Sequence, residues 1–194
     1  MEPGYFTETS DILTNKLSIT DAVELAIAEY RITDAQTGRL LADHSFSIFD
    51  FPCLLNIHKK LFDDIYPFAG KVRTVNISKP DSPVPFCYVD FILPEANRLF
   101  SELATDQYLL NLPTEDFSTK LAYYAAELNA LHPFREGNGR TIRLFLVLLA
   151  RNAGYLLDYS QASRGEILHA DREAFAGNMI PIQELYHKIV FKIN

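Results

Sequence analysis

The chain has 194 residues, of which 48% are hydrophobic and 22% are charged, and its formal net charge is −7. This composition excludes a disordered, fibrous or membrane-embedded protein and is typical of a compact globular one. The negative charge also excludes broad binding to nucleic acid, because such binding requires many Lys and Arg side chains to neutralise phosphates. No stretch approaches the roughly 18 apolar residues of a membrane span, so we expect no membrane partner.

The N-terminus and the cysteines indicate the compartment. The first residues, Met-Glu-Pro-Gly-Tyr, lack the basic and apolar regions of a signal peptide. Cys53 and Cys87 have no C-x-x-C spacing, which favours free thiols in a reducing compartment over a disulfide or a zinc site. We therefore expect a cytoplasmic protein. An effector delivered into another cell by a secretion machine would have the same features.

The N-terminal region predicts an arm followed by one long helix. Residues 1–18 have no hydrophobic period and are expected to form an irregular arm. The remaining residues, 19–194, suffice for a single domain with one core. A helix is predicted over about 20–42, with Thr20 as its N-cap, because apolar residues recur after this position without Gly or Pro as far as Ile32.

A second helix is predicted over 51–65, where the apolar residues fall on one face. Pro67 and Gly70 follow and end it. His58 lies within this helix, and we interpret it as a structural histidine rather than a catalytic one.

The hydrophobic period then changes towards two. Alternating residues in 72–78 and 86–90 flank a turn that contains Pro and Asp, which predicts a β-hairpin over about 72–90. A lone hairpin needs helices to pack against. Its free edge can also bind an extended peptide by strand pairing.

Helices predominate in the rest of the chain. They are predicted over about 94–104, 114–131, 139–152, 163–176 and 181–192. Pro94 suits a first helical position, Thr114 an N-cap and Gly154 a C-terminal stop. The helix over 139–152 is apolar nearly all round and should lie centrally. The fold class is therefore an all-α bundle with a small β-hairpin.

The segment 132–143 joins two of these helices and reads His-Pro-Phe-Arg-Glu-Gly-Asn-Gly-Arg-Thr-Ile-Arg. Gly137, Asn138 and Gly139 place a turn at the start of the buried helix. Unpaired N–H groups and the positive end of the helix dipole favour an anion there. We therefore expect this turn to bind phosphate.

Arg140 and Arg143 lie near the same helix end, where the dipole disfavours cations. Such placement favours a polyanionic ligand, since the guanidinium fork matches phosphate oxygens. The alternative is that both arginines form salt bridges with acids elsewhere in the chain.

Three other residues complete the candidate site. Glu136 is a candidate Mg²⁺ ligand, because Mg²⁺ is commonly held by one or two carboxylates and substrate phosphates; alternatively it is a helix-start acid. His132 can act as a general base near neutral pH, and its alternative role is structural. Phe134 is expected to anchor the loop. The P-loop and dinucleotide patterns are absent, and these residues leave open which phosphate is attacked.

This segment matches the Fic family pattern H-x-F-x-[D/E]-G-N-G-R-x-x-R at every specified position. The resemblance continues in residues 128–131 and 66–73 and in the order of the helices, so that it covers most of residues 10–192. It implies an all-helical core with a β-hairpin flap beside the active site. It also implies a protein adenylyltransferase, which transfers AMP from ATP to a Ser, Thr or Tyr hydroxyl of a target protein.

The resemblance further implies a role for each residue of the segment. His132 would deprotonate the target hydroxyl, Glu136 would bind Mg²⁺ and Phe134 would anchor the loop. The residues implied to bind the phosphates of ATP are Gly137, Asn138, Gly139, Arg140 and Arg143. The flap over 72–90 would dock the target protein as an added strand.

Many Fic proteins are inhibited by a helix with the pattern [S/T]-x-x-x-E-[G/N], whose glutamate pairs with the second arginine of the motif. The nearest match here runs from Thr20 to Leu25, and Leu25 departs from the pattern. We interpret Glu24 as an ordinary surface acid. The resemblance then implies that a small separate antitoxin supplies the inhibitory helix and that this chain is the toxin.

Two alternatives remain at the level of sequence. Relatives of this family transfer UMP, GMP, phosphocholine or phosphate, or remove AMP, and the sequence does not exclude these reactions. The chain could instead be a non-catalytic nucleotide- or protein-binding module. The joint presence of His132, Glu136 and the two arginines speaks against such a module, which would need no base.

Overall fold

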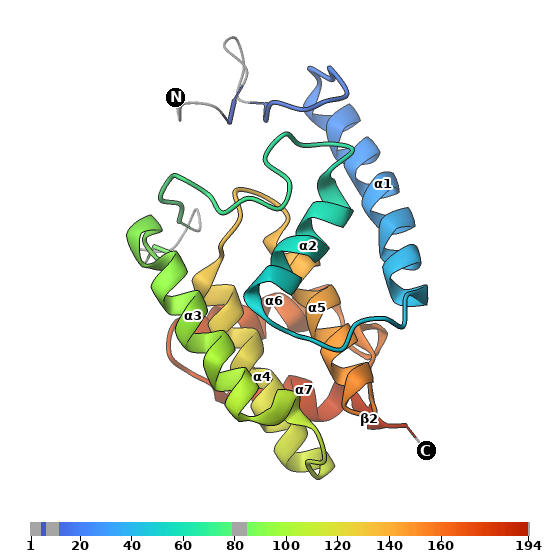
Figure 1. Cartoon of the computed structure of the whole chain (residues 1–194), viewed down its shortest axis with the longest axis vertical. Helices are drawn as coiled ribbons and strands as arrows, with labels where there is room; N and C mark the ends of the chain where they lie inside the picture. Colours follow the sequence, from blue (N-terminus) through green and yellow to red (C-terminus); the bar gives the residue numbers. More distant parts are fainter. Residues whose placement is uncertain (1–4, 7–11, 79–84, 194) are drawn as a thin grey trace.

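The computed structural model describes residues 5–6, 12–78 and 85–193. Within them seven α-helices and a two-stranded antiparallel sheet form an all-α architecture, as predicted (Figure 1). The helices are α1 (Ala22–Ala42), α2 (Phe51–Phe62), α3 (Val89–Thr105), α4 (Thr114–Leu131), α5 (Asn138–Asn152), α6 (Arg164–Phe175) and α7 (Ile180–Ile189). The strands are β1 (Tyr155–Leu157) and β2 (Val190–Lys192), and 3₁₀ turns cover Gln107–Leu109 and Tyr159–Gln161.

Helix α5 lies in the interior, as its apolar composition predicts. It packs against α2 and α4 (Figure 1). Phe145 of α5 is fully buried, and its ring meets those of Phe49 and Phe100 edge to face, with 5.7 Å between centroids in both pairs. Such pairs add to the burial of apolar area. The N-terminus of α5 is therefore fixed by the core.

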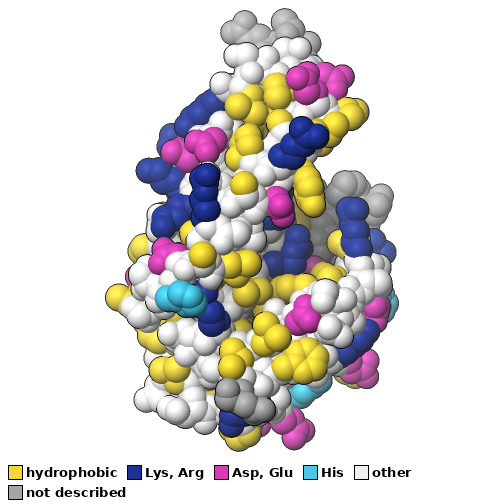
Figure 2. Space-filling view, turned by 90° about the vertical axis from the view of Figure 1, so that its right-hand side faces the viewer, with side chains coloured by type: hydrophobic (Ala, Val, Ile, Leu, Met, Phe, Trp, Pro, Cys, Tyr) yellow, Lys and Arg dark blue, Asp and Glu magenta, His cyan; other side chains and the backbone are white. Residues whose placement is uncertain are grey.

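Helix α1 covers one side of the molecule and buries only a narrow stripe. Its buried residues are Leu25, Thr33 and Leu40. Val23 and Tyr30 are exposed by 68% and 69%, and Figure 2 shows apolar and charged side chains intermixed on the face that carries α1. The N-cap is Asp21 rather than the predicted Thr20, because the Asp21 carboxylate accepts the N–H groups of Val23 and Glu24.

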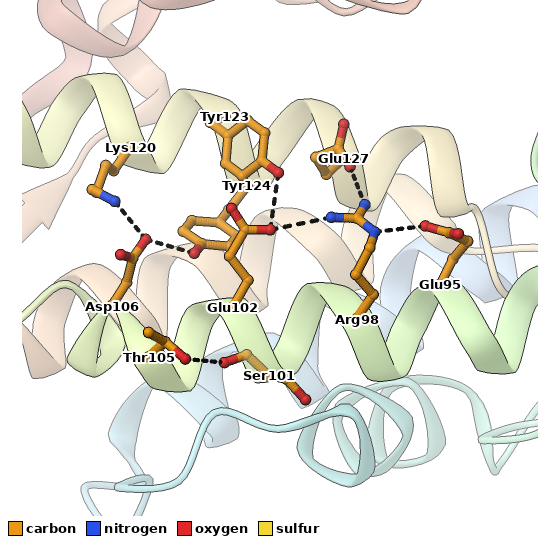
Figure 3. Close-up of polar contacts among 10 residues, drawn as sticks. All are labelled: Glu95, Arg98, Ser101, Glu102, Thr105, Asp106, Lys120, Tyr123, Tyr124 and Glu127. Carbon is orange, nitrogen blue, oxygen red and sulfur yellow. Dashed lines mark hydrogen bonds and ion pairs between the residues drawn. The ribbon is translucent and has the colours of Figure 1, made fainter.

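Helices α3 and α4 lie side by side and are joined by polar contacts (Figure 3). Arg98 donates to Glu127 across the helices, at 2.7 Å, and to Glu95 and Glu102 along α3. Lys120 pairs with Asp106 at 2.6 Å. Because these side chains are largely exposed, each ion pair contributes little stability. Together they help to orient α4, which ends at Leu131, immediately before His132.

Several predicted helix boundaries were wrong. Helix α3 begins at Val89, not at Pro94, because the Asn76 side chain accepts the Val89 N–H at 2.9 Å and starts the helix earlier. Helix α2 ends at Phe62 rather than at residue 65. Thr114 is the first residue of α4, and Pro113 takes the N-cap position.

The predicted hairpin over 72–90 was only partly right. Its two sides approach in antiparallel fashion through a single bridge, Ser78 to Pro85, and through the Phe86 N–H, which donates to the Ile77 carbonyl at 3.2 Å. The described part of this region forms no continuous strand. Residues 79–84, which contain the predicted turn, lie outside the described residues. The hairpin is thus an irregular flap rather than a regular β-ladder.

The sheet that does form was not predicted. Tyr155 pairs with Lys192 and Leu157 with Val190, so that the segment after α5 lies against the end of the described chain. Consequently the last helix ends at Ile189 instead of continuing to residue 192. Three-residue apolar runs are too short to distinguish strand from helix by their period.

The predicted arm, residues 1–18, is described at residues 5–6 and from residue 12 onward. Phe6 and Leu13 form an isolated bridge, and Tyr5 is buried with its ring edge-on to Phe68, at 5.3 Å between centroids. The other residues of the arm lie outside the described part. No helix in the described ranges combines the length and the apolarity needed to cross a membrane.

Candidate active site

The segment 132–143 forms a tight connection between α4 and α5. His132 is the C-cap of α4 and has a left-handed backbone, with φ 45°. Gly137 is the N-cap of α5, with φ 78°. A Cβ atom on Gly137 would lie 2.3 Å from the Phe62 ring. This position therefore requires glycine for both its conformation and its space.

The His132 ring lies between the end of α4 and the flap. It stacks on Phe86, with 3.6 Å between ring centroids and 13° between planes. Its Nδ1 is 3.2 Å from the Asn129 carbonyl oxygen. Because a carbonyl can only accept, Nδ1 carries the proton of the neutral ring, which makes Nε2 the basic nitrogen.

Arg73 joins the flap to His132, a contact that the sequence analysis did not anticipate. This buried side chain donates from Nε to the His132 carbonyl at 2.8 Å and from Nη1 to the Val75 carbonyl at 2.8 Å. Nη2 donates to the Cys87 carbonyl. One guanidinium thus binds both sides of the flap and the backbone of the candidate base.

His58 supports the next part of the loop. It is fully buried, and its Nδ1 accepts the Gly70 N–H at 2.8 Å, which places the ring proton on Nε2. Nε2–H then donates to the Glu136 carbonyl at 3.0 Å. Burial is the main cause that lowers the pKa of His58 to about 4. A neutral, structural histidine agrees with the interpretation of the sequence, although it is more deeply buried than expected.

Phe134 and Asn138 tie the loop to itself and to the core. Phe134 is fully buried and stacks on His58, with 3.8 Å between centroids. The Asn138 side chain accepts the Phe134 N–H at 2.9 Å and donates to the Phe134 carbonyl at 2.8 Å. The Asn138 side chain is therefore engaged in shaping the loop. This leaves its backbone N–H, at the start of α5, as the group that can meet a ligand.

Glu136 lies beside the N-terminus of α5. Its side chain is 44% exposed, and Oε1 accepts the Gly137 N–H at 2.8 Å. No cluster of three or more His, Cys, Asp or Glu side chains occurs among the described residues. An accessible carboxylate next to a helix N-terminus fits Mg²⁺, which retains several waters and takes its other ligands from substrate phosphates.

Arg140 points towards α1. Its Nη2 forms an ion pair with Glu29, and Nη1 lies 3.4 Å from the Thr33 hydroxyl. The guanidinium also lies over the Phe62 ring, 4.9 Å from the centroid. Tyr66 donates its hydroxyl to the same Glu29 carboxylate, and burial together with this contact raises the Tyr66 pKa. A salt bridge was one of the two alternatives predicted for Arg140, and its partner, Glu29, was not predicted.

Arg143 points towards the opposite side of α5. It lines a small cavity of about 30 Å³, with Asp171 and two tyrosines among the other lining residues. These are Tyr159 and Tyr186, whose hydroxyl oxygens are 2.9 Å apart. A Cβ atom on Gly139 would lie 3.2 Å from Arg143 Nη1, so that glycine leaves room for the guanidinium. The two arginines therefore diverge, although they are only three residues apart.

The segment from Thr20 to Leu25, the nearest match to the inhibitory pattern, lies around the start of α1. Glu24 is exposed in the first turn of α1, as expected for a surface acid. Glu29, one and a half turns further along α1, contacts Arg140. The structure thus brings together every candidate residue between His132 and Arg140 and adds Glu29, His58 and Arg73.

Comparison with known proteins gives consistent matches. Residues 49–150 match the model of the Fic/DOC family. The protein adenylyltransferase VbhT of Bartonella schoenbuchensis is 39% identical over 174 residues, which cover 90% of this chain but only 36% of VbhT. The probable protein adenylyltransferase y4lH of Sinorhizobium fredii is 37% identical over 172 residues, which cover 88% of this chain and 87% of y4lH.

The fold also matches solved structures. The N-terminal Fic domain of a VirB-translocated Bep effector from Bartonella quintana, crystallised with bound ADP, superposes with a TM-score of 0.95 at 27% identity. The match covers 98% of this chain and 95% of that domain.

Proposed function

We propose, from the premise that this chain belongs to the Fic/DOC family, that it is a protein adenylyltransferase using ATP to modify a protein hydroxyl. The observation that carries the proposal is the connection between α4 and α5. There a histidine with a basic Nε2, an accessible carboxylate and the N-terminus of a buried helix surround one loop. Phosphates bound at this helix end lie within reach of both side chains.

The reaction follows from these positions. His132 Nε2 accepts the proton of the target hydroxyl, whose oxygen attacks the α-phosphorus of ATP. The new bond joins the hydroxyl oxygen to AMP, while the bond between the α-phosphorus and the bridging oxygen breaks and pyrophosphate leaves. Mg²⁺ held by Glu136 would neutralise phosphate charge. The Nδ1 contact with Asn129 keeps the ring in the tautomer that accepts a proton at Nε2.

The phosphates are bound by backbone and by two arginines. The first N–H groups of α5, those of Asn138 and Gly139, have no intrahelical partner and bind phosphate oxygens, whereas the Gly137 N–H donates to Glu136. Arg140 and Arg143 bind the β- and γ-phosphates from opposite sides. Developing negative charge on pyrophosphate is thereby stabilised in a preorganised site.

The flap is the proposed docking site for the target protein. Its two described sides are anchored by Arg73 to the His132 carbonyl. An extended target segment that pairs with the edge of the flap would bring its hydroxyl near the base. A regular strand is not required for this role, because a few main-chain hydrogen bonds fix the direction of the segment.

Regulation by a separate protein completes the proposal. Glu24 is exposed, and Arg143 lines a cavity whose other walls come from α4, α6 and α7 and not from α1, so α1 offers no carboxylate to Arg143. A small antitoxin that offers a carboxylate to Arg143 would restrain this chain in the cytoplasm where it acts. Substitution of Glu24 by Gly is then expected to leave automodification unchanged, and a large rise would instead indicate inhibition within the chain.

The proposed reaction is tested by following both ends of ATP. Purified protein with Mg²⁺ and candidate targets should transfer label from α-labelled ATP to protein and release pyrophosphate. Label that appears only from γ-labelled ATP would refute AMP transfer. Parallel reactions with UTP, GTP and CDP-choline, analysed by the mass added to the intact protein, would identify a different transferred group.

A further inference from the structure

Glu29 is the one described acid outside the segment 132–143 that forms an ion pair with an arginine of that segment. It lies in the middle of α1, and its side chain is only 14% exposed although most of this helix faces water. Its carboxylate accepts the Tyr66 hydroxyl and the Arg140 Nη2. A carboxylate that is largely buried on a surface helix does not serve as a solvated surface charge. Its contacts within the protein must therefore account for its position.

Arg140 is held on several sides. Besides Glu29, it reaches the Thr33 hydroxyl and lies over the Phe62 ring. These contacts use few of its five N–H donors, and the side chain remains 32% exposed. The guanidinium is therefore fixed in orientation while part of the side chain remains exposed to solvent.

The same nitrogen of Arg140 faces a second carboxylate. Nη2 is paired with Glu29 Oε1 and lies 3.8 Å from Glu136 Oε1. The two carboxylates thus compete for one guanidinium, and the closer contact belongs to Glu29. If Glu29 were neutral, Coulomb attraction would draw the guanidinium towards Glu136.

A guanidinium paired with Glu136 would compete with a divalent cation for that carboxylate. We propose that Glu29 is a positioning residue that holds Arg140 away from Glu136 and so keeps the Glu136 carboxylate available to Mg²⁺. Glu29 also offsets the positive charge of Arg140 beside the cation, and Tyr66 fixes Glu29 in turn. This inference rests on the proposed function, because it assigns Glu136 to Mg²⁺.

The test measures the Mg²⁺ dependence of ATP binding by calorimetry, in the His132→Ala background so that no turnover occurs. Glu29→Gln keeps the size of the side chain and removes its charge. It should raise the Mg²⁺ concentration that gives half-maximal tightening of ATP binding by about tenfold, the lower end of the effect of an outer-shell metal partner. Tyr66→Phe should shift it in the same direction by less.

Two variants serve as matched controls. Glu24→Gln removes an equivalent charge from the exposed face of the same helix and should leave the Mg²⁺ dependence unchanged. Glu29→Asp retains the charge and should restore most of the wild-type dependence. When His132 is retained, Glu29→Gln should lower kcat at limiting Mg²⁺, and kcat should return to the wild-type value at saturating Mg²⁺. Added Mg²⁺ would not restore kcat to a protein that had lost its fold.

Three results would overturn the inference. They are an unchanged Mg²⁺ dependence in folded Glu29→Gln protein, a lower Mg²⁺ requirement, and ATP binding that does not depend on Mg²⁺ in any variant. A wild type that binds ATP with Mg²⁺ but transfers no AMP would refute the proposed reaction alone. In that case the binding shift in Glu29→Gln still decides the role of Glu29.

Discussion

Arg140 and Arg143 lie on the same helix, three residues apart, yet their surroundings differ in kind. Arg140 faces α1 and the end of α2, where it meets the carboxylate of Glu29 and the ring of Phe62, respectively. Arg143 faces the α6–α7 side, where it lines a cavity of about 30 Å³ together with Asp171 and the hydrogen-bonded pair Tyr159 and Tyr186. The first arginine is in direct contact with a full counter-charge, whereas the second shares a small cavity with polar groups and Asp171.

The difference indicates a division of work between the two arginines. A guanidinium whose charge is already balanced is suited to fix geometry, since new anions gain less from approaching it. A guanidinium beside a cavity can meet a phosphate and move slightly to do so. We therefore expect Arg140 to organise the site and Arg143 to contribute more to binding the leaving pyrophosphate.

Of the effects that distinguish the two arginines and their surroundings, the largest is expected at Arg143. Arg143→Ala should lower kcat/KM for AMP transfer by about 10²–10³-fold, as for other preorganised groups that stabilise transition-state charge. Initial rates with α-labelled ATP measure it. Arg151→Ala is a matched control on the same helix, since Arg151 donates only to the Leu41 and Asp43 carbonyls. Equal losses in both variants would contradict a specific role for Arg143.

The next largest effect concerns Gly137, which packs against the Phe62 ring that lies under the Arg140 guanidinium. Gly137→Ala should lower the free energy of unfolding by about 2–4 kcal/mol, because its Cβ would overlap Phe62 and its φ is positive. Gly154→Ala has a similar φ, 83°, with open space around the Cβ, and should cost only about 1 kcal/mol. Urea unfolding measures both. Equal losses of unfolding free energy in the two variants would show that the Phe62 ring moves aside for the new Cβ. Phe62 would then not be a rigid support for Arg140.

The pH dependence of stability tests the packing around His58, which supports the loop at Glu136. Its pKa is about 4 in the folded protein, against about 6.5 unfolded. Between these values the unfolded chain binds a proton that the folded chain does not, so stability falls as pH falls through this window. Lowering pH from 7 to 5 should cost the wild type about 2 kcal/mol more than His58→Gln. Urea unfolding curves that lose the same free energy in both proteins would contradict this.

The smallest expected effect is a difference in unfolding free energy between the Ala variants of the two arginines. Arg140→Ala should lower the free energy of unfolding by about 1–2 kcal/mol, between the values for exposed and buried ion pairs. Arg143→Ala should cost less, because no described carboxylate forms an ion pair with it. A double-mutant cycle with Glu29→Ala isolates the Arg140 pair. A coupling near zero would mean that Glu29 does not hold Arg140.

The comparison also explains what sequence could predict. The residues from His132 to Arg143 are contiguous, so their chemistry is legible in one window. Glu29 lies 111 positions from Arg140 and His58 lies 78 from Glu136. No local pattern distinguishes Glu29 from the other acids of a largely exposed helix. Only the packing of α1 and α2 against the start of α5 brings these residues together.

The fold was predictable to a similar extent. The long amphipathic helices and the buried α5 follow from periodicity. The start of α3 does not, because it depends on the Asn76 side chain capping Val89 from 13 residues away. The β1–β2 pair also required contact between segments more than thirty residues apart, Tyr155 and Lys192. Boundaries set by such contacts are invisible to a local pattern.

His132 is the proposed base of AMP transfer at this loop, and its role is open to direct measurement. The most direct measurement compares wild type and His132→Ala at matched ATP occupancy, determined by calorimetry, with α-labelled ATP and Mg²⁺. We expect labelled protein from the wild type and a loss of about 10²–10⁴-fold in the rate of labelling by the variant, with ATP binding retained. Labelling by His132→Ala at the wild-type rate would contradict the account.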